Sequence, residues 1–337
     1  MWRMVLSVVV WLAAICPAAG QEILGSGSTF AYPILARWAE AYEKISGVHL
    51  AYQPIGSAAG ITEIRSDVVD VAVSDAPLDD AALLRDGLAQ FPVVIGAIVP
   101  VVNLEGVESG QLRLTGPLLA DIYLGKVRRW NDPAIAAVNP GLALPDRAIL
   151  VVYRSDGSGT TFNWADFLSK VSNEWKEKIG VSTRLAWPTG VGGKGNAGVA
   201  DAVARVKGAI GYVEYSYALR AKLTYALVRN HAGNYLPPGA ASFQAATENF
   251  DWAKEHDFNA LLNDAPGAGA YPIMAMSFAV VRGYPKDASR ARATLEFFRW
   301  GLRDGRELAN SLQYLPLPPS LVELIEGYWA ERVHLPK

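Results

Sequence analysis

Three short polar turns carry the residue types that bind a small anion. They read Gly-Ser-Gly-Ser-Thr-Phe at 25–30, Ile-Gly-Ser-Ala-Ala-Gly at 55–60 and Arg-Ser-Asp-Gly-Ser-Gly-Thr at 154–160. Each turn offers hydroxyl groups and backbone N–H donors at the start of a predicted helix, where unsatisfied donors and a partial positive charge favour an anion. With one arginine in the third turn, the three segments together indicate a site for a small oxyanion.

Short apolar strands are predicted just before these turns, and helices just after them. The strands cover 22–24, 48–52 and 149–153, and the helices cover 33–45, 61–65 and 161–171. A strand, a glycine turn, a helix and another strand in this order are typical of an α/β fold. Because ligands of open α/β sheets bind at the carboxyl ends of the strands, all three turns stand where a ligand site is expected.

The chain has 337 residues, 51% of them hydrophobic, which is enough for two domains with cores of their own. The apolar runs 93–102 and 273–281 are interpreted as crossing points between two lobes. Lobe I then comprises 21–102 plus 275–337, and lobe II comprises 103–274. We expect the ligand to lie in the cleft between these lobes.

Three other segments have weaker patterns. Residues 91–102, almost entirely apolar, are predicted to form a pair of buried strands, and residues 230–268, rich in Asn, Ala, Gly and Pro, are interpreted as peripheral excursions. The glycine loop 192–196 is interpreted as a structural turn that could serve as a hinge or rim. It is not a Walker motif, because Gly195 stands where that motif needs Ser or Thr.

The first twenty residues have the pattern of a secretion signal. Arg3 supplies a positive charge, residues 5–15 are nearly all apolar, and small residues occupy 18–20. We expect a signal peptide over 1–20 and a periplasmic protein. The single cysteine, Cys16, lies in this segment, and a lipid anchor on it is the alternative, disfavoured because isoleucine precedes it. Cleavage after residue 20 would leave no thiol or disulfide chemistry.

Charge and histidine placement exclude several classes of function. A formal net charge of −2 argues against nucleic-acid binding, which needs a large basic surface. The four histidines, at 49, 231, 256 and 334, are scattered, and none lies in a turn. The sequence has neither a histidine pair at metal-ligand spacing nor a Gly-x-Ser-x-Gly motif around Ser158. We therefore expect no metal, no cofactor and no enzyme activity.

The ordered motifs resemble those of the periplasmic phosphate-binding protein of ABC-type phosphate importers. The resemblance runs from about Leu24 to the C-terminus. Besides the first and third turns, it rests on Tyr-Gln-Pro-Ile-Gly-Ser at 52–57, Val-Ser-Asp-Ala-Pro-Leu at 73–78, Asp-Ile-Tyr-Leu-Gly-Lys at 121–126, Gly-Gly-Lys-Gly-Asn at 192–196 and Gly-Ala-Ile-Gly-Tyr-Val-Glu-Tyr at 208–215. It implies a two-lobed, Venus-flytrap binding protein, monomeric, that closes on one phosphate and delivers it to membrane permease subunits.

The resemblance also implies roles for individual residues. Thr29 would give hydroxyl and backbone donors, Phe30 a backbone N–H, Ser57 its hydroxyl and Asp75 a carboxylate. From the opposite lobe, Arg154 would give its guanidinium, and Ser158, Gly159 and Thr160 backbone and hydroxyl donors. Asp156 is similar to the residue that pairs with the ligand-binding arginine and holds its plane.

Asp75 is the predicted discriminator among oxyanions. A carboxylate repels an anion unless the anion carries a proton that the carboxylate can accept, as phosphate does near neutral pH and sulfate does not. In a dry site, sulfate would leave two acceptors together, at a cost of roughly 1–3 kcal/mol or more. The residues by themselves leave open a binder of another oxyanion such as sulfate or molybdate, a hydrolase of phosphate esters or acyl groups, and a purely structural secreted protein.

Overall fold

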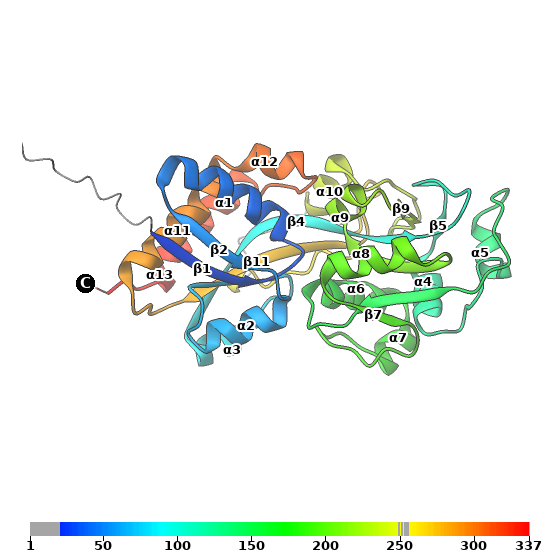
Figure 1. The fold of residues 1–337 in the computed structure, drawn as a ribbon, viewed down its shortest axis with the longest axis horizontal. Coiled ribbons are helices and arrows are strands. Elements are labelled where there is room, and N and C mark those ends of the chain that lie inside the picture. The colour runs from blue at the N-terminus through cyan, green and yellow to red at the C-terminus, as the bar shows by residue number, and fades with distance from the viewer. Residues whose placement is uncertain (1–20, 249, 251, 253–255, 337) are drawn as a thin grey trace, which may run out of the picture.

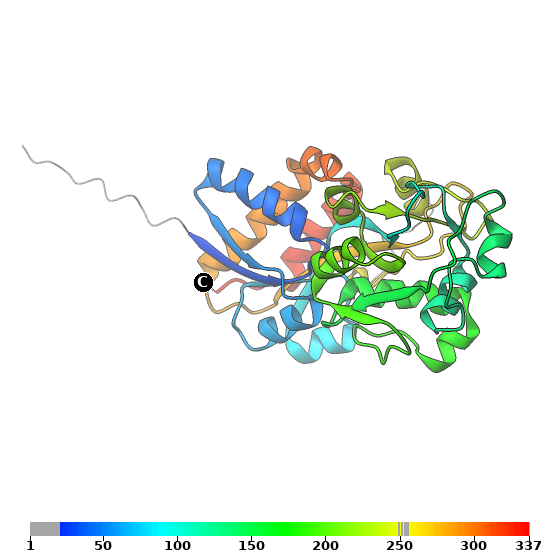
Figure 2. The ribbon, with the colours of Figure 1, turned by 45° about the vertical axis from the view of Figure 1, so that its right-hand side comes forward.

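The computed structural model describes residues 21–248, 250, 252 and 256–336, which form an elongated body of two halves (Figures 1 and 2). The predicted signal peptide, with Cys16, lies outside the described residues. The N-terminal segment, in blue, and the C-terminal segment, in orange and red, share one half, and the green middle of the chain forms the other. The chain therefore passes from one half to the other and returns.

A mixed β-sheet is the core of the first half. Its strand order is β2 (His49–Gln53), β1 (Glu22–Gly27), β3 (Val71–Ser74), β11 (Met274–Arg282) and β4 (Leu88–Val102). β1 runs parallel to β2 and β3, whereas β11 runs antiparallel to β3 and β4. The parallel strands point their carboxyl ends to one edge of the sheet, where the first two turns begin.

β4 continues the sheet into the second half. Its first part pairs with β11 as far as Ala97, and its last part, from Ile98, pairs with β8 (Ala209–Glu214). Beyond β8 lie β6 (Leu150–Arg154) and β7 (Val191–Gly193), and β9 (Thr224–Tyr225) pairs with the end of β4. A separate two-stranded sheet joins β5 (Arg113–Leu114) to β10 (Leu227–Val228). The third turn begins at the carboxyl end of β6.

β4 is a single strand of 15 residues, all of them buried, so the predicted strand pair at 91–102 is wrong. Pro92 lies opposite Phe278, at the register shift between Ser277 and Phe278 of β11. Proline lacks the N–H that a regular ladder needs, and it is tolerated at such irregular positions. The strand therefore continues past Pro92 and carries the chain into the second half.

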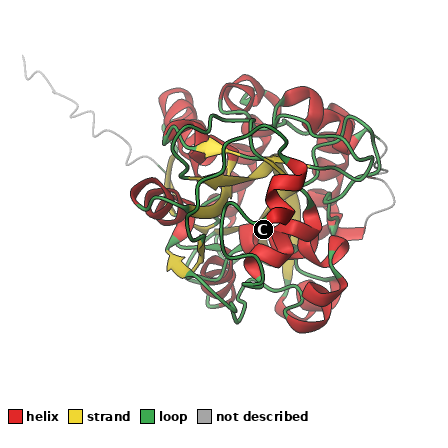
Figure 3. Ribbon diagram, turned by 90° about the vertical axis from the view of Figure 1, so that its right-hand side faces the viewer, coloured by secondary structure: helices red, strands yellow, loops and turns green. Residues whose placement is uncertain are grey.

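Helices pack around the strands, which the end-on view shows at the centre of the molecule (Figure 3). The first half contains α1 (Tyr32–Ser46), α2 (Ser57–Arg65), α3 (Asp80–Asp86), α11 (Ala288–Arg303), α12 (Arg306–Ser311) and α13 (Pro319–Arg332). The second half contains α4 (Gly116–Tyr123), α5 (Pro133–Val138), α6 (Gly159–Val171), α7 (Asn173–Lys178), α8 (Gly195–Arg205), α9 (Tyr215–Arg220) and α10 (Ala240–Thr247). A 3₁₀ turn, η2 (His256–Phe258), contacts β4.

Helix α1 shows how local sequence sets the elements beside the turns. Pro33 lies in its first turn, where the missing N–H costs no hydrogen bond. Trp38 is buried on its inner face, and Gly47 ends the helix in the left-handed conformation, with a φ of 73°. The predicted helix at 33–45 is confirmed, extended by one residue at each end.

The predicted α/β class is confirmed by the sheet and its helices. The segment 230–268 is more than a peripheral excursion, since it contains α10 and buries Asn230, Phe243 and Leu262. Among the described residues, no helix combines the length and the apolar character needed to cross a membrane.

Candidate anion-binding site

The first turn, between β1 and α1, depends on Gly27. Its φ is 124°, and a Cβ there would lie 2.2 Å from the carbonyl oxygen of Val73, so glycine is required. The N–H of Ser28 donates to the same carbonyl at 2.7 Å, which ties the turn to β3. Thr29 and Phe30 follow just before α1, and both are buried.

The second turn leads from β2 into α2, and it touches the third turn. Gly56 has a φ of 101°, and a Cβ there would lie 2.5 Å from a carboxylate oxygen of Asp156. Ser57 is the first residue of α2, and the N–H of Ala58 donates to the carbonyl of Gly157 at 3.1 Å. These two turns, one from each half, are therefore in direct contact.

The third turn leads from β6 into α6. Ser158 caps the helix, because its hydroxyl accepts a hydrogen bond from the N–H of Thr161 at 3.1 Å. The N–H of Gly159 donates to Oγ of Ser57 in the other half at 3.0 Å. A Cβ at Gly159 would lie 2.6 Å from Cβ of Asp75, so this approach needs glycine.

Asp75 follows β3 and lies between the turns, with 2% of its surface exposed. Its Oδ1 accepts hydrogen bonds from the hydroxyls of Ser28, at 2.5 Å, and Ser277 of β11, at 2.7 Å. Its Oδ2 has one long contact within the described chain, 3.5 Å to Oγ of Ser57. Its backbone carbonyl accepts from Nδ2 of Asn163, on α6, at 2.6 Å.

The ionisation of Asp75 depends on pH in the mildly acidic range. Burial raises the pKa of this carboxyl to about 6, although hydrogen bonds from Ser28 and Ser277 and the charge of Arg154 act in the opposite direction. Above this pKa the group is an ionised acceptor in a dry site. Below it, the group is a neutral carboxyl that can also donate.

Arg154 ends β6, and its side chain is 1% exposed. Its guanidinium binds Asp156 at two points, Nε to Oδ1 at 2.8 Å and Nη2 to Oδ2 at 2.5 Å, and Nη1 donates to Oγ1 of Thr160 at 3.2 Å. Burial alone would raise the pKa of Asp156, but the hydrogen bond and charge of Arg154 hold it below its usual value. The pair is therefore buried and oriented, and it is not a surface ion pair.

Thr29 connects the first turn to the other half. Its Oγ1 accepts from the N–H and from Nδ2 of Asn196, at 3.2 and 2.9 Å. Its carbonyl accepts from the hydroxyl of Tyr217 at 2.7 Å, and the carbonyl of Phe30 accepts from Tyr314 at 2.6 Å. These bonds orient the peptide planes of the turn, so its N–H groups have fixed directions.

The structure brings all eight predicted site residues, with Asp156, into one buried cluster between the halves. Thr29, Phe30, Ser57 and Asp75 come from the first half, and Arg154, Ser158, Gly159 and Thr160 from the second. Within the described chain, the N–H groups of Phe30 and Thr160 donate to no protein group. Because one arginine stands beside two carboxylates, an anion here would be held mainly by oriented N–H and O–H donors, not by excess positive charge.

Four side chains of this cluster have no role in the sequence prediction: Ser28, Asn163, Asn196 and Ser277. Ser28 stands inside the first turn, and Asn196 ends the glycine loop that was expected to be structural. Ser277 is the one hydroxyl residue in the apolar run 273–281, and this isolated polar position is the signal that marks it. Asn163 lies four residues after Gly159, so it follows one turn later on the same face of α6.

A groove of about 310 Å³ adjoins the cluster and is lined from both halves. Thr29 and Tyr32 lie on one side of it, and Asp156, Lys194 and Arg220 on the other. Among the described residues, no group of three or more His, Cys, Asp or Glu side chains could hold a metal ion.

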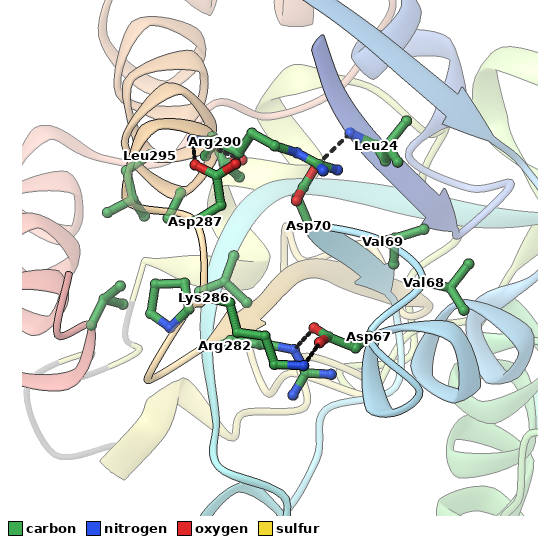
Figure 4. A pocket seen from close by; sticks show the side chains of 15 residues that line it. Leu24, Asp67, Val68, Val69, Asp70, Arg282, Lys286, Asp287, Arg290 and Leu295 are labelled. Carbon is green, nitrogen blue, oxygen red and sulfur yellow. Dashed lines mark hydrogen bonds and ion pairs between the residues drawn. The ribbon is translucent and has the colours of Figure 1, made fainter. Parts of the chain in front are cut away.

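A second pocket, of about 270 Å³, lies beside β1 and α11 (Figure 4). Asp67 pairs with Arg282 and Lys286, and Asp70 pairs with Arg290 at 2.8 Å. The third carboxylate, Asp287, caps α11. None of the predicted site residues lines it. Its charges are therefore balanced within the pocket.

Comparison with known proteins gives the family. A model described as the PBP superfamily domain matches residues 14–304. The phosphate-binding protein PstS of Xylella fastidiosa (strain 9a5c) is 52% identical over 309 residues, covering 92% of this chain and 85% of that protein. The chain belongs to the PstS phosphate-binding protein family. The PstS protein of Pasteurella multocida (strain Pm70) is 44% identical over 331 residues, covering 98% and 96%.

Solved structures have the same fold. A high affinity periplasmic phosphate-binding protein (PfluDING) bound with phosphate gives a TM-score of 0.72 at 21% identity, over 91% of this chain and 93% of that one. The phosphate-binding protein from Stenotrophomonas maltophilia gives 0.69 at 18% identity, over 91% and 93%. The predicted two-lobed periplasmic-binding-protein fold is confirmed, and the two halves are its lobes.

Proposed function

We propose that this protein binds one inorganic phosphate ion between its lobes, with high affinity and selectivity, and delivers it to the permease of an ABC phosphate transporter. The observation that carries the proposal is the buried carboxylate of Asp75, which lies among N–H and O–H donors from both lobes. The relatives named as phosphate-binding protein PstS support phosphate as the ligand.

In this proposal the donors of both lobes surround the phosphate oxygens. Lobe I contributes Thr29, Phe30 and Ser57, lobe II contributes Arg154, Ser158, Gly159 and Thr160, and Asp156 holds the guanidinium plane. Oγ of Ser57 already accepts from the N–H groups of Gly159 and Asp75, at 3.0 and 3.3 Å. Its own proton is therefore available to a phosphate oxygen.

Selectivity follows from the proton that hydrogen phosphate carries. An ionised Asp75 can accept that proton's hydrogen bond through Oδ2, whereas a sulfate oxygen at the same place would face an unshared carboxylate oxygen. Burial strengthens this penalty, because water cannot solvate either acceptor. For the same reason, any oxyanion that carries no proton should be a poor ligand.

Binding would draw the lobes together. We keep the predicted boundaries as part of the proposal, with lobe I over 21–102 plus 275–337 and lobe II over 103–274. Donors on both lobes contact one ion only when the cleft is closed, so the ion stabilises the closed form. With a signal peptide over 1–20, a monomer closed around phosphate would present its ligand to the permease from the periplasm.

The cluster supports binding and not hydrolysis. Oγ of Ser158 caps α6, and within the described chain it makes no hydrogen bond to a histidine or carboxylate that could act as a base. His49 and His231 have exposed side chains that pair with carboxylates elsewhere. The proposal therefore assigns no catalytic residue and no cofactor.

The test is calorimetric titration with phosphate and, separately, sulfate, after the protein is unfolded and refolded to remove bound anion. We expect one-to-one phosphate binding and no sulfate heat. Asp75→Asn should lose the discrimination, while Asp201→Asn, whose side chain is 57% exposed, should retain it. Equal binding of both anions by the wild type would contradict the role of Asp75, and binding of neither would overturn the function.

A further inference from the structure

We propose that Ser28 and Ser277 set the selectivity of the site by engaging Oδ1 of Asp75, so that Oδ2 alone accepts the proton of a bound hydrogen phosphate. The inference rests on the proposed function and goes beyond it. It names two positioning residues outside the predicted ligand contacts, one on the first turn and one on β11.

The hydrogen bonds of Ser28 define the direction of its proton. The N–H of Ala31 donates to Oγ of Ser28 at 3.1 Å, so this oxygen is already an acceptor. Its proton is then free for Oδ1 of Asp75, at 2.5 Å. Ser28 thus donates to the carboxylate and favours the ionised form.

Ser277 reaches Asp75 from a different strand. The β3–β11 register pairs Phe278 with Ser74, which sets Ser277 opposite Asp75. On its other side, Ser277 pairs with Val94 of β4, next to the irregularity at which Val93 of β4 is left without a partner in β11. The hydroxyl of Ser277 is fully buried and lies 2.7 Å from Oδ1.

Two donors satisfy one carboxylate oxygen, because each such oxygen has about two lone-pair sites. Oδ1 is therefore saturated by Ser28 and Ser277. Oδ2 keeps its acceptor capacity, since its contact to Ser57 is 3.5 Å long. The two oxygens are thus distinguished: one is anchored to lobe I, and the other is left for the ligand.

Other charged and titratable groups near Asp75 act with the serines or stay neutral. Arg154, from lobe II, lowers the pKa of Asp75 through its charge. Tyr52 stands on β2, and burial together with the charge of Asp75 raises the pKa of its hydroxyl well above its usual value, so it remains neutral. Burial opposes the serines by raising the pKa of Asp75.

Removal of either serine should raise the pKa of Asp75, because the effect of burial would be less opposed. The carboxyl would then remain protonated to a higher pH and would donate to the ligand instead of accepting from it. Sulfate, which needs donors only, would compete with phosphate over a wider pH range. The loss of one hydrogen bond to an ionised group corresponds to an upward shift of about one to two units in the pKa of Asp75.

The experiment measures sulfate competition against phosphate from pH 5 to pH 8.5 in wild type, Ser28→Ala, Ser277→Ala and Ser277→Thr. Ser277→Ala should move the pH at which sulfate is rejected upward by about one to two units, and Ser277→Thr, which keeps the hydroxyl, should restore the wild-type profile. The matched control is Ser169→Ala, on α6, whose buried hydroxyl has no partner in the described chain. Identical profiles in all variants would overturn the inference and leave phosphate binding intact.

A second readout needs no ligand. The carbon-13 signal of the Asp75 carboxyl, followed by NMR during a pH titration of the anion-free protein, reports its ionisation directly. We expect the midpoint to rise in both alanine variants and to be unchanged in Ser169→Ala. A wild type that binds no phosphate would overturn the proposed function and, with it, the role assigned to Ser28 and Ser277.

Discussion

Nδ2 of Asn163, on lobe II, lies 2.6 Å from the backbone carbonyl oxygen of Asp75, on lobe I. The same amide group donates to the carbonyl of Gly159 at 3.0 Å, and Asn263 donates to the carbonyl of Asn163 at 3.1 Å. The side chain of Asn163 thus links the first turn of α6 to Asp75, which we propose accepts a hydrogen bond from the bound phosphate. This link exists only when the lobes are together, so it should favour the closed form.

Asn163→Ala should weaken phosphate binding without unfolding the protein. The substitution removes one hydrogen bond made only in the closed form and leaves the carbonyl of Asp75 without this donor. A neutral hydrogen bond contributes about 0.5–1.5 kcal/mol, so we expect the Kd for phosphate to rise about twofold to tenfold. Calorimetry measures the change.

Asn103→Ala is the matched control for this prediction. Nδ2 of Asn103 also donates to two carbonyls, those of Val203 at 2.9 Å and Ala204 at 2.8 Å, but it joins segments within lobe II. We expect this variant to lower the unfolding temperature with little change in Kd. An equal loss of affinity in both variants would show that Asn163 has no special part in closure.

Gly159→Ala should obstruct closure directly. A Cβ at this position would lie 2.6 Å from Cβ and 2.7 Å from the backbone nitrogen of Asp75, across the cleft. Overpacking typically costs about 1–3 kcal/mol, which corresponds to a Kd about five- to a hundredfold higher. The unfolding temperature should hold, because alanine favours the helix and the open cleft has room for it.

Gly327→Ala on α13 is the control for Gly159→Ala, since nothing lies within 4 Å of the added Cβ. It should keep the wild-type affinity. Small-angle scattering with and without phosphate adds a second measurement, in which the Gly159 variant should stay more extended than the wild type. Full compaction of that variant on phosphate would contradict the steric argument.

Local sequence was sufficient to predict that the strand–helix turns place hydroxyl groups at helix starts. Ser57, Ser158 and Thr160 stand at helix starts, where hydroxyls and free N–H groups can be predicted from neighbouring residues alone. Ser277 could not be predicted in this way, because it lies about two hundred positions from Asp75 and meets it only through the β3–β11 register. A register is decided by the whole sheet and not by any one strand.

The remaining misses have similar causes. Asn163 sits inside a helix pattern, where a polar residue is usually assigned to the solvent side, and its role appears only when the lobes meet. The strand pair expected at 91–102 proved to be one strand, because Pro92 lies beside an irregularity in the β4–β11 pairing, and the sequence of 91–102 alone does not indicate that pairing. Contacts with distant segments of the chain, and not local propensity, decided both outcomes.

Arg154→Lys should weaken phosphate binding although the positive charge is kept. A lysine cannot hold Asp156 at two points and also reach Thr160, as the guanidinium does. Loss of charge-assisted hydrogen bonds costs about 1.5–3 kcal/mol, so the Kd should rise about ten- to a hundredfold in calorimetry. Arg205 forms an exposed pair with Asp201, so Arg205→Lys should leave the Kd unchanged. An equal change of Kd in the two variants would contradict the argument from the geometry of Arg154.

Glu214 is a buried carboxyl where β8 meets β4, opposite Ile98. It caps α9, and it accepts hydrogen bonds from the backbone N–H of Ser216, at 2.9 Å, and from the hydroxyl of Ser216. Burial raises the pKa of Glu214 from 4.5 to about 8, against the effect of these bonds. Between about pH 4.5 and pH 8, the folded protein therefore holds a proton here that the unfolded chain has already released.

The sign of the resulting pH dependence follows from that raised pKa. The contribution of Glu214 to the free energy of unfolding is fully present below about pH 4.5 and is lost as the pH rises towards about 8. The loss between pH 5 and pH 7 is on the order of 2 kcal/mol. Glu214→Gln keeps a neutral group of the same shape at all pH values, so its unfolding temperature, measured without phosphate, should fall less between pH 5 and pH 8 than that of the wild type.

Glu174→Gln is the control: Lys126 and Lys178 lower the pKa of Glu174 to about 2, so it is ionised throughout this range and its removal should leave the slope unchanged. Parallel plots of unfolding temperature against pH for wild type and Glu214→Gln would mean that Glu214 is ionised in the folded protein, with its charge stabilised by hydrogen bonds from Ser216 and its neighbours.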